Sequence, residues 1–254
     1  MLELLGLSKR FSGIPVVNDV CFVARPSEVV GYLGPNGAGK STTVKMLTGL
    51  LPPSDGEIHY RGENIQKRLI DYKRRVGYVP EEPYLYPYLS GREYLQLVGR
   101  LRSIRDKILN EKIDLLLQLF SLFPHRYAAI ASYSKGMRQK ILIGAALLHN
   151  PELLFFDEAE SGLDITSALV FRSLVKALAS EGKVIFYSSH ILEVVEKVCS
   201  KIIILHKGRV VANDSVEQLR ILMQMPSLEG IFQQLLVQRD PEKTAAEIVE
   251  LMKL

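Results

Sequence analysis

The chain has 254 residues, of which 47% are hydrophobic and 24% are charged, and its formal net charge is +4. This balance excludes disordered and fibrous proteins, and the length predicts one or two globular domains. The longest stretches without Asp, Glu, Lys or Arg, such as residues 29–39, are shorter than the ~20 residues of a membrane-spanning helix, and residues 1–10 lack the features of a signal peptide. The sequence therefore predicts a cytoplasmic protein.

Charged and sulfur-containing residues argue against other classes of site. Basic residues are spread in short clusters such as residues 73–75, without the dense basic stripe and interleaved aromatic residues of a nucleic-acid-binding surface, so we expect no nucleic-acid partner. Cys21 and Cys199 lie far apart and belong to no Cys-x-x-Cys or Cys/His cluster, which argues against a zinc site and a disulfide framework. We expect both cysteines to be small buried hydrophobic residues.

In the first half of the chain, a strand, a Gly-rich loop and a helix are predicted in succession. Residues 28–34 form a short apolar run that ends at glycine, and residues 40–51 have helical composition. Residues 76–79 form a second short apolar run. From Ser90 the pattern becomes helical, because Ser90 and Glu93 form a capping box and apolar residues follow at helical spacing up to residue 149.

In the second half, apolar runs alternate with helical stretches. Strands are predicted at residues 153–156 and 184–188, and helices at residues 165–180 and 191–200. Such alternation predicts a mainly parallel sheet with both faces covered. Residues 202–212 predict an antiparallel hairpin.

We therefore expect an α/β fold of the P-loop NTPase class, with a mainly parallel sheet core, an antiparallel β part and an all-helical subdomain. An ATPase domain would span residues 1–216, with its core in residues 1–89 and 150–216 and the helical subdomain in residues 90–149. Residues 217–254 would form a C-terminal helical extension.

The strongest single motif lies at residues 34–42, which match G-x-x-x-x-G-K-[ST] between a predicted strand and a predicted helix. Glycines allow successive N–H groups to point at a polyphosphate, and the start of the helix adds its positive dipole end. Lys40 would reach the β- and γ-phosphates of ATP, Ser41 would ligate Mg²⁺ and Thr42 would contact the α-phosphate. The predicted phosphate-binding residues are Gly34, Pro35, Asn36, Gly37, Ala38, Gly39, Lys40, Ser41 and Thr42.

Two acidic residues follow the predicted strand at residues 153–156. Ligands of α/β sheets bind at the carboxyl ends of the strands, so Asp157 is expected to hold Mg²⁺ through water. Glu158 is placed to polarise a water for attack on the γ-phosphorus. A solvated strand end is the alternative interpretation, and the P-loop favours the nucleotide site.

Five further motifs occur in the order found in one protein family. Phe11 precedes the P-loop, Glu81 follows the second apolar run, and residues 133–139 read Tyr-Ser-Lys-Gly-Met-Arg-Gln. Residues 161–164 read Ser-Gly-Leu-Asp, and residues 188–190 read Ser-Ser-His. Over residues 1–214 the chain resembles the ATPase subunits of ATP-binding-cassette (ABC) transporters, and it contains no Asn-Lys-x-Asp motif of a GTPase.

The resemblance implies a nucleotide-binding role for each motif. Phe11 would stack on the adenine, and Glu81 stands where the family has the glutamine of its Q-loop and would serve Mg²⁺. Ser134 and Gly136 belong to the segment that resembles the signature motif. Asp164 would link two sites across a dimer interface.

The resemblance also implies the catalytic set. His190 resembles the switch histidine, which would contact the γ-phosphate or the attacking water and orient Glu158. The implied catalytic residues are Glu158, His190 and Lys40, and the implied Mg²⁺ ligands are Ser41, Asp157 and Glu81.

The same resemblance implies the partners. ATP would be held between the P-loop of one chain and the signature motif of a second cassette, either an identical copy or a paralogue. A separate transmembrane permease subunit would carry the cargo, which places the chain on the cytoplasmic face of the membrane. Residues 81–88 would contact the permease, with packing under a loop as the alternative. The Ser-Lys-Gly-Met string and residues 226–232 resemble those of exporters.

Three segments depart from the family pattern: the signature segment, the Q-loop position and residues 159–160. Lys135 replaces a signature glycine and Met137 removes the usual amide. Glu81 keeps an oxygen but loses the amide donor of glutamine, and Ala159-Glu160 stands where many members have Pro-Thr or Pro-Ser, a change expected to be neutral.

Two rival functions are a soluble ABC ATPase, for example of the iron–sulfur assembly type, and a non-hydrolysing nucleotide-gated binding module, against which Glu158 argues.

Overall fold

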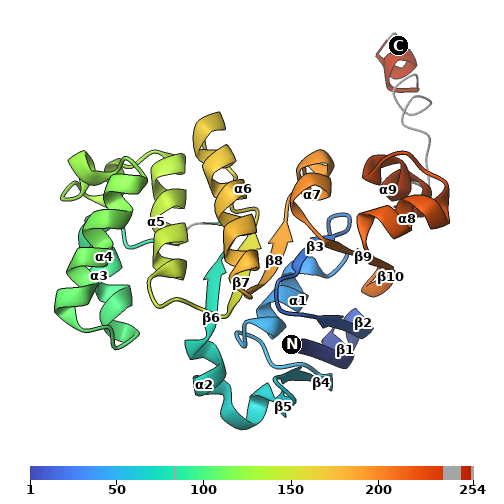
Figure 1. The fold of residues 1–254 in the computed structure, drawn as a ribbon. Coiled ribbons are helices and arrows are strands. Elements are labelled where there is room, and N and C mark those ends of the chain that lie inside the picture. The colour runs from blue at the N-terminus through green and yellow to red at the C-terminus, as the bar shows by residue number, and fades with distance from the viewer. Residues whose placement is uncertain (83, 237–246, 253–254) are drawn as a thin grey trace.

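The computed structural model describes residues 1–82, 84–236 and 247–252. Within these ranges, the larger sheet has six strands in the order β10-β9-β3-β8-β7-β6 (Figure 1). Neighbouring strands from β9 to β6 are parallel, and β10 is antiparallel to β9, which confirms the hairpin expected at residues 202–212. The strands are β3 (Val29–Leu33), β6 (Val76–Val79), β7 (Leu153–Asp157), β8 (Val184–Ser188), β9 (Lys201–His206) and β10 (Arg209–Asp214).

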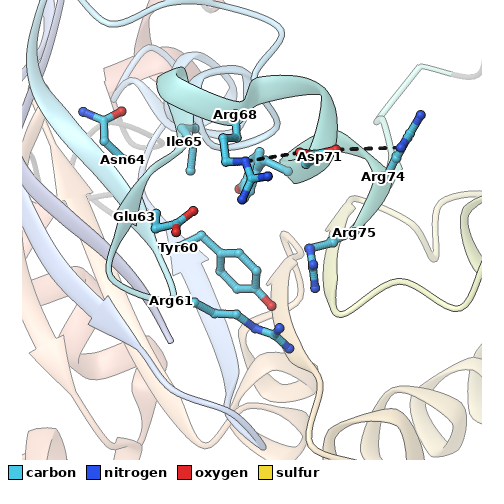
Figure 2. Close-up of a pocket in the computed structure, with 10 residues that line it drawn as sticks. Tyr60, Arg61, Glu63, Asn64, Ile65, Arg68, Asp71, Arg74 and Arg75 are labelled. Atoms are coloured by element: carbon cyan, nitrogen blue, oxygen red, sulfur yellow. Dashed lines mark ion pairs between the residues drawn. The ribbon is translucent and has the colours of Figure 1, made fainter.

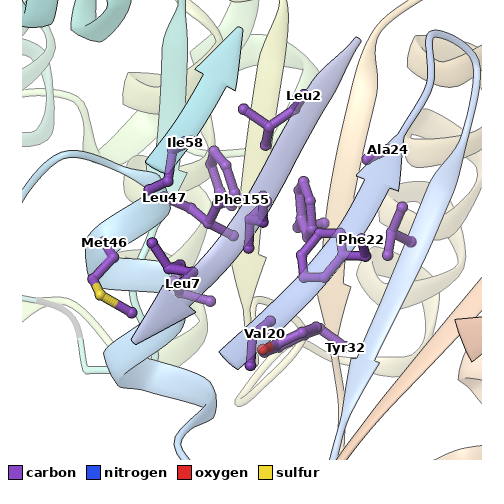
Figure 3. Packing of buried hydrophobic residues seen from close by; sticks show 14 of the residues in the cluster. Leu2, Leu7, Val20, Phe22, Ala24, Tyr32, Met46, Leu47, Ile58 and Phe155 are labelled. Carbon is purple, nitrogen blue, oxygen red and sulfur yellow. The ribbon is translucent and has the colours of Figure 1, made fainter. Parts of the chain in front are cut away.

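A second, antiparallel sheet carries the strand order β2-β1-β4-β5. Its strands are β1 (Leu2–Phe11), β2 (Ile14–Ala24), β4 (Asp55–Tyr60) and β5 (Glu63–Asn64). Leu2, Leu7 and Phe22 from this sheet belong to the same buried cluster as Phe155 of β7 (Figure 3). The antiparallel β part of the expected fold is therefore one layer packed on the larger sheet.

Helices cover the two faces of the larger sheet. On the face toward the antiparallel sheet lies α1 (Lys40–Leu47), whose Met46 and Leu47 are fully buried. On the other face lie α6 (Ile165–Ser180) and α7 (Leu192–Val198), whose apolar side chains pack against those of β3, β7, β8 and β9. Because β3, β7 and β8 are buried on both faces, their sequences are continuous apolar runs.

The helices between β6 and β7 form a body with a core of its own, at one side of the molecule in Figure 1. These helices are α3 (Gly91–Leu101), α4 (Asp106–Leu119) and α5 (Lys135–Leu147). The capping box at the start of α3 is confirmed, because the Ser90 side chain accepts from the Glu93 N–H while the Glu93 side chain accepts from the Ser90 N–H. Leu109, Ile113 and Leu117 of α4 are buried in this core.

Two short helices follow β10, namely α8 (Val216–Met223) and α9 (Leu228–Leu236). Leu219 and Ile231 pack into the core on the α6 side of the larger sheet. Part of the extension expected over residues 217–254 lies outside the described residues, at 237–246 and 253–254. No helix in the described ranges is long and apolar enough to span a membrane.

The two cysteines differ in their surroundings. Cys199 is buried, as expected. The expectation was wrong for Cys21, which is exposed on β2, where its sulfur accepts a hydrogen bond of 3.1 Å from the Gly6 N–H. The apolar positions of β2 alternate with exposed ones, and Cys21 occupies an exposed position.

Candidate active site

The P-loop connects the buried strand β3 to α1, and two of its glycines are required by close backbone contacts. Gly34 has φ 154°, and a Cβ there would lie 2.4 Å from the Leu205 carbonyl oxygen. Gly39 has φ 102°, and a Cβ there would lie 2.7 Å from the Val16 carbonyl oxygen. A side chain at either position would displace the backbone of β9 or β2, so these glycines fix the path of the loop.

Lys40 is the first residue of α1, and its side chain folds back over the loop. Its Nζ donates to the carbonyl oxygens of Gly34 at 2.6 Å and Pro35 at 3.1 Å. Burial lowers the pKa of Lys40, while the charges of Asp157, Glu158 and Glu81 act in the opposite direction. The ammonium group is therefore held at the loop by neutral carbonyl oxygens. A bound phosphate could replace these carbonyls as its hydrogen-bond acceptor.

Asp157 and Glu158 occupy the carboxyl end of β7. Asp157 is 7% exposed and accepts a hydrogen bond of 2.6 Å from the Ser188 hydroxyl of the neighbouring strand. The same hydroxyl oxygen accepts from the Glu158 N–H at 3.2 Å. Ser188 thus connects the ends of β7 and β8, and it positions the Asp157 carboxylate and the Glu158 backbone.

Glu158 lies in the left-handed region with φ 50°, at the point where the chain leaves the sheet. Its carboxylate accepts a hydrogen bond of 3.3 Å from the His190 N–H, and the His190 Nε2 lies 3.5 Å from its other oxygen. Burial is the largest cause that raises the pKa of Glu158, and the charges of Asp157 and Glu81 add to it, whereas His190 opposes it. A carboxylate with a raised pKa is a better proton acceptor than an ordinary surface glutamate.

These side chains line two adjoining pockets of about 240 Å³ and 250 Å³ at the carboxyl edge of the sheet. Asn36, Lys40, Glu158 and His190 line both pockets. The predicted residues that line at least one of them are Gly34, Pro35, Asn36, Gly37, Gly39, Lys40, Ser41, Thr42, Glu81, Asp157, Glu158 and His190. The P-loop and the acidic strand end therefore form one concave site.

Other predicted residues lie outside these two pockets. Phe11, at the end of β1, is 46% exposed, with the Lys9 ammonium 5.5 Å from its ring centroid. Ser134 caps α5 and accepts from the Met137 N–H at 3.2 Å. Asp164 caps α6, and hydrogen bonds from Ser167 lower the pKa of Asp164 to about 2.

Gly136 also lies outside the pockets, where a Cβ would stand 2.5 Å from the Gly162 carbonyl oxygen. Ala38 belongs to the P-loop and is buried, and its carbonyl oxygen accepts from the Gly208 N–H at 3.0 Å. These two small residues are therefore packing positions within this chain.

Val16, Tyr32, Leu33, Leu192 and Phe232 also line the pockets, although none of them was predicted as a site residue. Val16 of β2 borders the P-loop pocket, and Phe232 of α9 borders the adjoining one beside His190. Val16 belongs to no motif and Phe232 only to the exporter-like residues 226–232, because both reach the site through the packing of β2 and α9 around the loop. In the sequence, Ile231, Leu235 and Leu236 recur at helical spacing, which is a signal that this helix packs on a core.

The oxygen donors of the site fit a magnesium ion that arrives with a nucleotide. Ser41, Glu81 and Asp157 line the same pocket. Among the described residues, no group of three or more His, Cys, Asp or Glu side chains is placed to hold a metal ion. Mg²⁺ is typically bound by one or two carboxylates together with substrate phosphates and water, which is the kind of set found here.

Comparison with known proteins gives consistent matches. The family model described as ABC transporter matches residues 17–161. The chain is 37% identical over 242 residues to the ABC transporter ATP-binding protein NatA of Bacillus subtilis (strain 168), covering 93% of this chain and 98% of that protein. It is 36% identical over 212 residues to the linearmycin resistance ATP-binding protein LnrL of the same organism, covering 84% of this chain and 68% of LnrL.

A solved structure described as the ATP binding subunit of an ABC transporter has the same fold. It superimposes with a TM-score of 0.87 at 33% sequence identity, and the match covers 92% of this chain and 99% of that one. The expected fold class is therefore confirmed.

Proposed function

The chain belongs to the ABC transporter family, as an ATP-binding subunit and an ATPase, and we propose that it pairs with a second cassette around ATP to power export through a separate membrane permease. One observation carries this proposal. Lys40, Glu158 and His190 line a pocket that Ser134 and Gly136 of the same chain do not reach. The site of one chain therefore holds the base and the P-loop but lacks the signature segment.

Hydrolysis would proceed by in-line attack of a water on the γ-phosphorus. Glu158 accepts the proton of that water, and His190 keeps the Glu158 carboxylate in place through the contacts described above. Lys40 stabilises the negative charge on the phosphate oxygens. Mg²⁺, held by Ser41, Asp157 and Glu81, would neutralise charge on the β- and γ-phosphates.

The segment that begins α5 completes the site from a second chain. Ser134 caps this helix of 13 residues, so its N-terminal N–H groups and its dipole favour an anion such as a γ-phosphate. A second cassette facing the first would bring this helix end to the open side of the P-loop pocket. The two chains would then separate after hydrolysis, which is how ATP turnover drives motion in the permease.

The permease contact is proposed at residues 84–88. Tyr84, Tyr86 and Tyr88 are 80%, 61% and 92% exposed, which argues against the alternative that they pack under a loop. Aromatic residues are enriched at protein interfaces. Glu81, which lines the nucleotide pocket, lies just before them in the chain, so a push on this segment could reach the γ-phosphate end of the site.

A crosslinking experiment tests this contact. Cys21 is first replaced by serine, because its thiol is exposed, and a new cysteine is placed at Tyr88. A bifunctional reagent applied to native membranes should join Tyr88→Cys to a multi-span protein encoded with this chain. The matched control is Ile221→Cys on α8, at 64% exposure, which should not be joined. Crosslinks to soluble proteins alone would favour the soluble ABC ATPase.

Export is proposed from the similarity to a protein named for linearmycin resistance, together with the exporter-like residues 226–232. Inside-out vesicles of the host membrane expose the cassette to added ATP. Compounds from a labelled antibiotic panel should enter the vesicle lumen only with ATP, and vesicles carrying Lys40→Ala should take up none. ATP-driven release from preloaded vesicles would indicate import.

A further inference from the structure

A second pocket lies at the end of the sheet opposite to the P-loop. It has a volume of about 510 Å³ and is formed by β4, β5, α2 (Leu69–Arg74) and the segments between them (Figure 2). Arg75 lines it directly before β6, and Glu152, the ion-pair partner of Arg75, directly precedes β7, whereas Asp157 ends β7. The sheet therefore separates this pocket from the nucleotide site.

Four arginines line the pocket, and they outnumber its carboxylates. Arg61, Arg68, Arg74 and Arg75 stand against Glu63 and Asp71. Figure 2 shows Arg61, Arg68 and Arg75 arranged around the Tyr60 ring, whereas Arg74 points away at the end of α2. All four arginines lie within residues 61–75, where the turn before β5, the 3-10 helix Ile65–Arg68 and α2 bring them to one pocket.

Two of the three carboxylates in or beside the pocket are each shared by two arginines. Glu152 lies 2.9 Å from Arg61 and 2.6 Å from Arg75 and also accepts the hydroxyl hydrogen of Tyr60. Asp71 lies 3.4 Å from Arg68 and 3.7 Å from Arg74. With Glu63 of the lining, three carboxylates therefore face four positive charges.

Hydrogen-bond donors remain in excess as well. Each guanidinium carries five N–H donors. Neither the Arg68 nor the Arg74 guanidinium group hydrogen-bonds to a residue in the described part of the chain, and these side chains are 68% and 72% exposed. The Tyr60 hydroxyl adds no further free donor, because it already donates to Glu152.

The pocket is built on a rigid frame. Tyr72 is buried beneath α2, and its hydroxyl donates to the Leu47 carbonyl oxygen at 2.5 Å. The Arg75 carbonyl oxygen accepts from the N–H groups of Glu152 and Leu153 at 2.9 and 3.0 Å. Arg75 and Glu152 are therefore held in place before any ligand arrives, which reduces the entropy that binding loses.

We propose that this arginine pocket binds a phosphate-bearing ligand at a site separate from the nucleotide site. Guanidinium groups match phosphate oxygens with paired hydrogen bonds, and several of them around one point favour a ligand with two or more negative charges. The phosphate belongs either to a free phosphorylated compound or to the headgroup of an acidic phospholipid. The proposal is independent of whether the chain drives export.

Two binding assays test the proposal, both in a Lys40→Ala background without Mg²⁺, so that the P-loop competes weakly. The first titrates pyrophosphate by calorimetry. The second measures flotation with phosphatidylglycerol vesicles against phosphatidylcholine vesicles. The variants are Arg68→Gln, the pair Arg68→Gln/Arg75→Gln, and the control Arg105→Gln, which removes one exposed charge before α4.

Arg68→Gln should weaken binding about tenfold and the pair about a hundredfold, since a hydrogen bond to a charged group contributes on this scale. Loss in the pyrophosphate assay identifies a free phosphorylated compound, and loss in the phosphatidylglycerol assay alone identifies a lipid headgroup. Arg68→Gln leaves the Glu152 ion pairs intact, so it remains informative if the pair misfolds. Equal binding by Arg68→Gln and Arg105→Gln in both assays overturns the proposal.

Discussion

Lys135, in the first turn of α5, donates a hydrogen bond of 2.7 Å from its Nζ to the Ser161 hydroxyl, in the loop between β7 and α6. The contact joins the helical subdomain to the loop that follows the proposed base of the same chain. A glycine, which the family commonly has at this position, could not make it. Lys135, which departs from the family pattern, thus makes a tertiary contact within this chain.

Lys135→Met and Ser161→Ala separate the charge of Lys135 from its hydrogen bond. We expect kcat/KM for ATP to fall about tenfold in Lys135→Met, because a charge that would face the γ-phosphate in a paired cassette is lost with the hydrogen bond. Ser161→Ala removes only an exposed hydrogen bond and should change the rate less than about twofold. Equal losses in the two variants would show that the hydrogen bond between Lys135 and Ser161, and not the charge of Lys135, supports ATP hydrolysis.

Lys40→Ala should lower steady-state ATP hydrolysis at least about a hundredfold, because the ammonium group that stabilises charge on the phosphates is removed. The measurement is phosphate release with saturating Mg-ATP. Lys45→Ala is the matched control, since Lys45 is an exposed residue in the last turn of the same helix and should leave the rate unchanged. Undiminished turnover in Lys40→Ala would contradict the assignment of the site.

Glu158→Gln should trap a dimer in the presence of Mg-ATP. The substitution keeps the size and backbone of the residue but removes the proton acceptor, so ATP is bound and not cleaved. Gel filtration with light scattering should show the dimer with Mg-ATP and the monomer with ADP. Glu181→Gln, an exposed change at the end of α6, should behave as the unmodified chain does. A strictly monomeric Glu158→Gln with Mg-ATP would count against ATP-driven pairing.

The pH dependence of hydrolysis follows from the surroundings of Glu158. Burial raises its pKa above the ordinary value of a glutamate, and a general base works only when ionised, so kcat/KM should rise with pH and level off above that pKa. The charge of Glu81 contributes to the rise in the pKa of Glu158, so Glu81→Gln should move the acidic limb toward lower pH. Profiles between pH 5 and 8.5 test this, and an acidic limb that moves upward would refute the electrostatic account.

Glu160 is expected to stabilise the folded chain. This differs from the expectation that Ala159-Glu160, in place of Pro-Thr or Pro-Ser, is a neutral change. Its side chain is 10% exposed, accepts hydrogen bonds of 2.9 and 2.6 Å from Arg172 and also accepts the Tyr187 hydroxyl hydrogen. Glu160→Gln breaks this charged pair between the end of β7, α6 and β8, and should lower the free energy of unfolding by about 1–3 kcal/mol. Urea titration of Glu160→Gln against the exposed control Glu181→Gln measures the difference, and matching midpoints would refute it.

The main elements of the larger sheet could be predicted from local pattern. The strand at residues 184–188 and the helix at residues 165–180 are found with the expected bounds, because a strand buried on both faces is a continuous apolar run and a helix of that length has a clear period. The helix expected at residues 191–200 is shorter, at Leu192–Val198. The individual strands β1 and β2 were not predicted, since their pairing depends on contacts with each other and with β4.

The sequence by itself determined the phosphate loop and its lysine, because that chemistry resides in backbone N–H groups and a side chain that are adjacent along the chain. Only the tertiary structure decided that Glu158 and His190 meet beside Lys40, that Ser134 lies outside their pocket and that Arg61, Arg68 and Arg75 share another. Distances between such residues follow from strand order, in which β8 lies between β3 and β7. That order is set by the burial of apolar side chains over the whole chain, which no short motif records.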